Sequence, residues 1–256
     1  MLYHFHNTPI HYETFGNGQA IVLIHGFLES ATMWKPLIPQ LSKNNFVITI
    51  DLPGHGNSGV IAETHSMELM AEVVDAVLQK LHISSATFIG HSMGGYVTLA
   101  HTELFSEKVD KIILLNSTPA ADSEERKKNR NRALKVIDQN AKAYISMAIG
   151  NLFAEKSREN FTSEIETLKT EAYSFPVEGI KAAIKGMRDR KNRTAVLKNF
   201  KKDKHVILAK EDPILSILEA EKLAAQCGCK IKIIEGGHMS LIENRDSVAD
   251  YLHIIG

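Results

Sequence analysis

Short apolar runs rich in β-branched residues alternate along the chain with stretches in which apolar side chains recur every three or four positions. The run at residues 20–24 is apolar throughout, as expected of a strand buried on both faces. This alternation is typical of a mostly parallel sheet with helices on both faces. The predicted strands cover residues 2–6, 10–15, 20–24, 46–50, 86–89, 112–115, 205–209 and 230–234. We therefore predict an α/β fold built on a mostly parallel, eight-stranded sheet.

The helical pattern is clearest over residues 66–81, where apolar residues recur at three- and four-residue intervals and Ser66 can cap the first turn. Further helices are expected over 93–104 and 247–253. The alternation breaks after Pro119, because residues 120–195 are helical in pattern and contain no convincing strand. We predict one core made of residues 1–119 and 196–256, interrupted by a helical insertion over 120–195.

Composition narrows the classes of partner. The 256 residues are 44% hydrophobic and 23% charged, with 30 basic and 30 acidic side chains. A neutral balance gives no electrostatic reason to bind nucleic acid or an anionic membrane, so a small-molecule substrate is expected. No apolar run approaches a membrane span, and the first residues lack the pattern of a signal peptide. Cys227 and Cys229 are read as reduced thiols of a cytoplasmic protein. The sequence leaves the oligomeric state open.

Ser92 is the candidate nucleophile. It lies in Gly-His-Ser-Met-Gly (residues 90–94), which follows a predicted buried strand and opens a predicted helix. A tight strand-to-helix turn exposes a serine and needs nearly side-chain-free neighbours. A serine hydroxyl also needs a base, a group that orients the base, and donors for the oxyanion. The backbone N–H groups of Phe27 and Met93 are expected to be those donors, because each follows the end of a buried strand.

Asp212 and His238 are the candidates for the orienting acid and the base. Asp212 follows the strand that ends at Ala209, and Pro213 fixes the turn. His238 follows the last strand and two glycines, which let the loop bring an imidazole over the sheet. Imidazole suits the role because its pKa lies near the working pH. Neither the cysteines nor the other histidines have the spacing of a zinc site, so we expect no metal and no cofactor.

These residues resemble those of the α/β-hydrolase superfamily, in the branch with a helical cap between the sixth and seventh strands. The order Ser92, Asp212, His238 is the order found in that superfamily. The segments that carry the resemblance are His25-Gly26-Phe27, Asp51-Leu52-Pro53-Gly54-His55-Gly56-Asn57-Ser58, Gly90-His91-Ser92-Met93-Gly94-Gly95, Lys210-Glu211-Asp212-Pro213 and Gly237-His238. The resemblance implies that residues 120–195 form the cap and that Asp51 and His55 are structural. It argues against dehalogenases and epoxide hydrolases, which carry aspartate where Ser92 stands. The menaquinone-pathway lyase carries arginine where Tyr96 stands.

The sequence predicts the class of substrate less specifically than it predicts the fold and the nucleophile. We expect a serine hydrolase that cleaves a small to medium, largely apolar carboxylic ester or thioester through an acyl-enzyme on Ser92. The residues expected to line an apolar pocket, beside Phe27 and Met93, are Trp34, Met147, Phe153, Met187 and Met239. The same three candidate groups serve carbon–carbon bond hydrolases, lactonases and cofactor-free haloperoxidases. A small-molecule receptor of the hydrolase fold also stays open.

Overall fold

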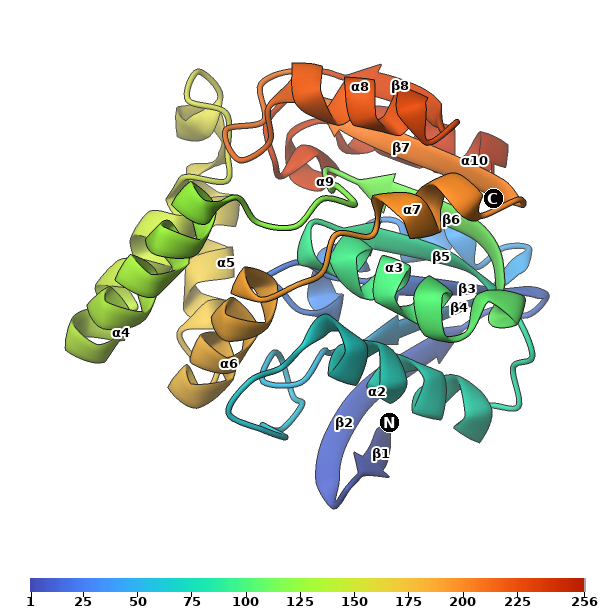
Figure 1. Cartoon of the computed structure of the whole chain (residues 1–256), viewed down its shortest axis with the longest axis horizontal. Helices are drawn as coiled ribbons and strands as arrows, with labels where there is room; N and C mark the ends of the chain where they lie inside the picture. The colour runs from blue at the N-terminus through green and yellow to red at the C-terminus, as the bar shows by residue number, and fades with distance from the viewer. Residues whose placement is uncertain (256) are drawn as a thin grey trace.

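The computed structural model, which describes residues 1–255, contains one eight-stranded sheet with strand order β1-β2-β4-β3-β5-β6-β7-β8 (Figure 1). The strands are β1 (Leu2–Phe5), β2 (Thr8–Phe15), β3 (Gln19–Ile24), β4 (Asn45–Ile50), β5 (Ala86–His91), β6 (Val109–Leu115), β7 (Asp203–Ala209) and β8 (Lys230–Ile234). Strands β3 to β8 are parallel to their neighbours, whereas β1 and β2 pair antiparallel at one edge. The predicted mostly parallel, eight-stranded sheet is confirmed.

Helices cover both faces of the sheet. The helical elements are η1 (Ala31–Trp34), α1 (Ile38–Leu41), α2 (Met67–Lys80), α3 (Met93–Leu104), η2 (Ser106–Lys108), α4 (Glu124–Gly150), η3 (Arg158–Phe161), α5 (Thr162–Ala172), α6 (Val177–Arg188), α7 (Thr194–Asn199), α8 (Ile217–Gln226), α9 (Ser240–Glu243) and α10 (Arg245–Ile255). Side chains of β3 alternate between two cores, which is why positions 20–24 of this strand are all apolar. Val22 and Ile24 pack with α2 and α3, and Ile21 and Leu23 pack with α1 and α10.

The chain between β6 and β7 is helical and, within residues 116–202, contains no strand. Figure 1 shows α4, α5 and α6 gathered at one end of the sheet, while α7 returns beside α3. The long helix α4 is broken at Asn140, whose φ of −157° and ψ of 86° are not helical. The Asn140 side chain accepts a hydrogen bond from the N–H of Ala143 and so caps the second half of the helix.

Local differences from the predicted elements lie at turns and at the end of the chain. The first hairpin turns at His6 and Asn7, which both have positive φ, and Pro9 already belongs to β2. The last helix runs over Arg245–Ile255, and the short α9 before it was not predicted. Ser66 caps α2 through a hydrogen bond from the N–H of Leu69, as the sequence indicates. None of the helices described over residues 1–255 has both the length and the apolar character needed to cross a bilayer.

Candidate active site

Ser92 occupies the sharp turn between β5 and α3, with a φ of 49° and a ψ of −113°. A side chain in this conformation is strained, so the surrounding packing must hold it. The packing leaves no room for neighbouring side chains. A Cβ on Gly90 would lie 2.4 Å from the carbonyl oxygen of Gly94, and one on Gly94 would lie 2.1 Å from that of Ile24. The glycines of the motif are therefore required by close contact of backbone with backbone.

The structure brings Ser92, His238 and Asp212 into one hydrogen-bonded row. His238 Nε2 lies 2.7 Å from Ser92 Oγ, and His238 Nδ1 lies 2.7 Å from Asp212 Oδ2. Because a carboxylate only accepts, Nδ1 carries the proton and Nε2 faces the hydroxyl as an acceptor. The second carboxylate oxygen of Asp212 accepts from the N–H groups of Ile214 and Leu215, at 2.7 and 2.9 Å.

The ionised form of Asp212 is favoured in this place. Burial opposes the charge, but the His238 imidazole and the two backbone N–H groups outweigh it and lower the pKa of Asp212. The side chains of His238 and Asp212 are only 2% and 3% exposed, so the row is sheltered from water along most of its length. This arrangement can accept the proton of Ser92 and stabilise the resulting imidazolium.

The backbone of His238 is held from two sides. Its carbonyl oxygen accepts from His91 Nε2 at 2.9 Å and from Asn116 Nδ2 at 2.7 Å, and both donors belong to the core. Its N–H donates to the carbonyl of Leu152, 2.9 Å away, in the segment after α4. The orientation of the imidazole is thus fixed by groups from three distant parts of the chain.

Glu29 and His91 form a buried ion pair next to Ser92. His91 Nδ1 lies 3.0 Å from Glu29 Oε2, the same oxygen accepts the N–H of Gly26 at 2.6 Å, and the side chains are 0% and 2% exposed. Both ring nitrogens of His91 face acceptors, since Nε2 donates to the carbonyl of His238. Burial opposes the imidazolium, but the Glu29 carboxylate outweighs it and raises the pKa of His91. Burial likewise opposes the carboxylate, and His91 reverses this and lowers the pKa of Glu29.

The loop after β3 passes close to the Ser92 turn. His25 Nδ1 lies 2.7 Å from the carbonyl of Gly26, and His25 Nε2 accepts the N–H of Leu52 at 2.9 Å, which fixes the start of the loop. Over the part of the chain that the structure describes, neither the N–H of Phe27 nor that of Met93 has an acceptor. Both groups are therefore free to donate to a ligand, and their role as oxyanion donors stays a prediction.

Asp51 and His55, to which the resemblance assigns a structural role, are held in contacts within the protein. The carboxylate of Asp51 accepts the N–H of Ala31 at 2.8 Å and the N–H of Asn57 at 2.9 Å. The ring of His55 is fully buried and lies 6.0 Å from the ring of Phe27. Burial, followed by the nearby His25, lowers the pKa of His55 well below its ordinary value, so this side chain is neutral.

Two of the predicted pocket residues do not pack with Met93 in the core. Trp34 is fully buried against α1, on the opposite face of the sheet from α3, so it cannot line the site. Met147 is 56% exposed on α4 and does not belong to the core cluster of Met93, so its contact with substrate stays a prediction. An apolar side chain in sequence does not reveal which face it occupies. Phe153, Met187 and Met239 are buried in the same core cluster as Met93, and their contact with substrate stays a prediction.

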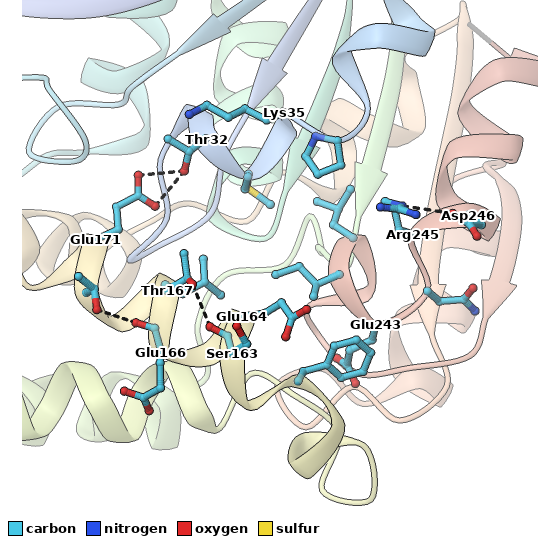
Figure 2. A pocket seen from close by; sticks show the side chains of 18 residues that line it. Thr32, Lys35, Ser163, Glu164, Glu166, Thr167, Glu171, Glu243, Arg245 and Asp246 are labelled. Carbon is cyan, nitrogen blue, oxygen red and sulfur yellow. Dashed lines mark hydrogen bonds and ion pairs between the residues drawn. The ribbon is translucent and has the colours of Figure 1, made fainter.

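A groove of about 1250 Å³ lies between η1, α5 and α9 (Figure 2). None of the three residues of the Ser92 row lines it. Its wall carries several carboxylates, among them Glu171, which accepts from the hydroxyls of Ser30 and Thr32 at 2.6 and 2.9 Å. Glu243 stands at the end of the groove nearest the His238 loop and was not singled out from sequence. Over residues 1–255, no three His, Cys, Asp or Glu side chains are grouped so as to hold a metal ion.

The sequence of residues 19–245 matches the family model of the alpha/beta hydrolase fold. The chain belongs to this family. It is 29% identical to a thermophilic esterase from Thermogutta terrifontis, whose structure it resembles with a TM-score of 0.89 over 96% of this chain and 92% of that one. It resembles the enol-lactonase from Burkholderia xenovorans LB400 with a TM-score of 0.92 over the whole of both chains, at 21% identity, which shows a shared fold only.

Among curated proteins, the chain is 28% identical to an (E)-2-((N-methylformamido)methylene)succinate hydrolase of Acinetobacter baylyi. This match covers 68% of the chain and 63% of that protein. In this and other curated relatives that it matches, the chain spans less than two thirds of the protein's own length. The relatives share the family, but their names refer to the cleavage of different kinds of bond.

Proposed function

We propose that this protein is a serine hydrolase that cleaves a small to medium, largely apolar carboxylic ester or thioester through an acyl-enzyme on Ser92. The observation that carries the proposal is the continuous row from Ser92 Oγ through His238 to Asp212, with both contacts at 2.7 Å. Serine needs such a base because its hydroxyl is a weak nucleophile at neutral pH. The similarity to the Thermogutta terrifontis esterase supports an ester as the substrate.

The proposed reaction has two halves. His238 Nε2 takes the proton of Ser92 as the Oγ attacks the carbonyl carbon, and Asp212 stabilises the imidazolium through Nδ1. The free N–H groups of Phe27 and Met93 receive the oxyanion, and Met93 lies at the N-terminus of α3, where the helix dipole favours negative charge. His238 then protonates the leaving alcohol or thiol. In the second half, water loses a proton to the same nitrogen as its oxygen attacks the acyl carbon, and His238 then returns the proton to Ser92 Oγ as the acid leaves.

Residues 120–195 act as a cap in this proposal. They supply α4, α5 and α6 at one end of the sheet, and the buried Phe153 and Met187 come from this segment. An apolar lining beneath the cap favours an acyl chain without charge, because burying an unpaired charge is costly. The proposal needs no metal and no cofactor.

The test is a series of p-nitrophenyl esters of increasing chain length, with matching thioesters and a lactone. Wild type should turn over at least one ester, and Ser92→Ala and His238→Gln should lose about 10⁴-fold or more in kcat/KM. Ser163→Ala, which removes an exposed hydroxyl on α5, is the matched control and should retain full activity. A fluorophosphonate probe should label wild type and Ser163→Ala but not Ser92→Ala. Ester turnover equal to that of Ser92→Ala at every chain length contradicts the proposal.

A further inference from the structure

Glu243, the last residue of α9, joins the His238 loop to the cap through three hydrogen bonds. Its Oε1 accepts the N–H of Gly237, next to His238, at 3.0 Å. Its Oε2 accepts the N–H of Ala154 at 3.1 Å and the hydroxyl of Ser157 at 2.5 Å, both in the cap. Figure 2 shows Glu243 among the residues that line the groove. One half-buried side chain thus satisfies donors from two segments more than 80 residues apart in sequence.

The cap segment 152–157 lies directly against the His238 loop. The N–H of His238 donates to the carbonyl of Leu152 at 2.9 Å. A Cβ on Gly237 would lie 2.3 Å from the backbone nitrogen of Ala154, so only glycine lets the two backbones meet. The sequence suggests that Gly237 serves a sharp turn, yet its φ is not positive, whereas that of Gly236 is 105°. The contact with the cap accounts for the second glycine.

Two sets of hydrogen bonds hold the backbone of His238, one from the core and one from the cap. Two core side chains hold its carbonyl: His91 is the last residue of β5, and Asn116 directly follows β6. Cap groups hold its N–H and, through Glu243, the N–H of the residue before it. If segment 152–157 moves away, the hydrogen bonds from the core persist while both N–H groups lose their acceptors or their support. The backbone of His238 is then held on its carbonyl side alone, while the ring keeps its contact with Asp212.

We propose that Glu243 is a positioning residue that makes the placement of the base His238 depend on docking of the cap segment 152–157. The proposal rests on the role of His238 as base in the proposed function. Phe153, fully buried within the same segment, is next to the residues that grip His238, so contacts made by an acyl chain with this segment also favour a correctly placed base. Linkage requires the reverse as well: a well-placed base favours the docked cap.

Glu243→Gln is the first variant, because an amide has only one acceptor oxygen. Its NH₂ must face either the N–H of Gly237 or the N–H of Ala154, so one side of the clamp breaks while the size of the side chain is kept. Glu235→Gln is the matched control. Glu235 precedes the same loop, is exposed and pairs with Lys210 on the surface, and the charge of Lys156 in segment 152–157 acts on it less strongly than that of Lys210. Exposed pairs of this kind contribute little to stability.

The measurements are kcat and KM per active site titrated with the fluorophosphonate, and the low-field NMR signal of the proton between His238 and Asp212. Titration removes the effect of unfolded molecules, which a merely structural role would produce. Glu243→Gln should lower kcat per titrated site by about tenfold, since misplacing a reacting group by about 1 Å can cost about a hundredfold. It should also broaden or abolish the low-field signal, which is assigned by its loss in Asp212→Asn. Glu235→Gln should change neither.

Ser157→Ala tests whether the clamp acts as a unit. Alone it removes one bond on the cap side and should cost a smaller factor, whereas in the Glu243→Gln background it should cost nothing further. Independent, multiplying losses, or an unchanged kcat and an unchanged low-field signal in Glu243→Gln, overturn the inference. The NMR arm needs only the His238 to Asp212 bond, so it decides the question even if wild type hydrolyses no ester and the proposed function fails.

Discussion

Removing the charge of Glu29 should destabilise the fold strongly, although this residue takes no part in the proposed proton transfer. Glu29→Gln leaves His91 buried with a neutral amide in place of its carboxylate partner, and the oxygen that receives the N–H of Gly26 loses its charge. Unit charges 3.0 Å apart attract by about 5.5 kcal/mol at an effective dielectric constant of about 20. Breaking one partner of a buried pair typically costs about 3–5 kcal/mol, and we expect a loss in that range.

Urea unfolding of wild type, Glu29→Gln, His91→Gln and the double variant measures the effect as a double-mutant cycle. The double variant should be clearly more stable than the sum of the two single losses predicts, because neither charge is then left unpaired. The direction in which pH changes this contribution to stability differs between the two groups. The contribution of Glu29 is lost as pH falls through its lowered pKa, and that of His91 is lost as pH rises through its raised pKa, so the pair stabilises most near neutrality. Single losses under about 1 kcal/mol, or additivity in the double variant, refute the reasoning.

Three further predictions concern other parts of the molecule. Lowering the pH from 7 to 5 should reduce the free energy of unfolding by about 2 kcal/mol through His65, whose pKa burial lowers from 6.5 to about 4. The reason is that the unfolded chain binds a proton at this residue and the folded chain does not. Urea unfolding of His65→Gln should lack this part of the pH dependence, and a pH dependence equal to that of wild type contradicts the assignment. Gly237→Ala should lower kcat per titrated site by pushing away the backbone of Ala154, whereas Gly150→Ala, whose Cβ would meet nothing within 4 Å, should be neutral; equal effects of the two refute the contact. Trp34→Ala should cost about 3–5 kcal/mol of stability yet leave kcat per titrated site unchanged, and a selective loss of kcat would return this residue to the pocket.

The fold and the Ser92 row were accessible from sequence because both depend on where strands end. Parallel strands bring their carboxyl ends to one edge, so residues that directly follow β5, β7 and β8 must meet there. Ser92, Asp212 and His238 each follow such a strand, and the structure places them in contact. The residues that support this row could not be predicted from sequence. Glu29 and Glu243 contact segments far away in the chain, and no periodic pattern in the sequence marks such contacts.

The residues that line the pocket were harder to predict from sequence, for a related reason. Met147 lies on a helix that is partly exposed, and Trp34 lies in a short 3-10 helix, so in neither place does the local pattern state which face meets the site. Hydrophobicity predicts burial on average, yet the side on which a residue is buried depends on how helices pack around the sheet. The alternation along β3 shows the contrast, because there a period of two assigns each residue to one core or the other.

The break in α4 at Asn140 divides the helix into two halves that make different contacts. Before it, Arg130 pairs with the buried Asp122, which also holds Arg190, so the first half is anchored to the base of the insertion. After it come the buried Tyr144, Ile145 and Ile149, which lead directly into segment 152–157. A mutation in the second half therefore need not propagate into the anchor. For protein engineering, the exposed positions 142, 143 and 147 of this half can be varied, whereas Tyr144, Ile145 and Ile149 must keep their size to fill the core.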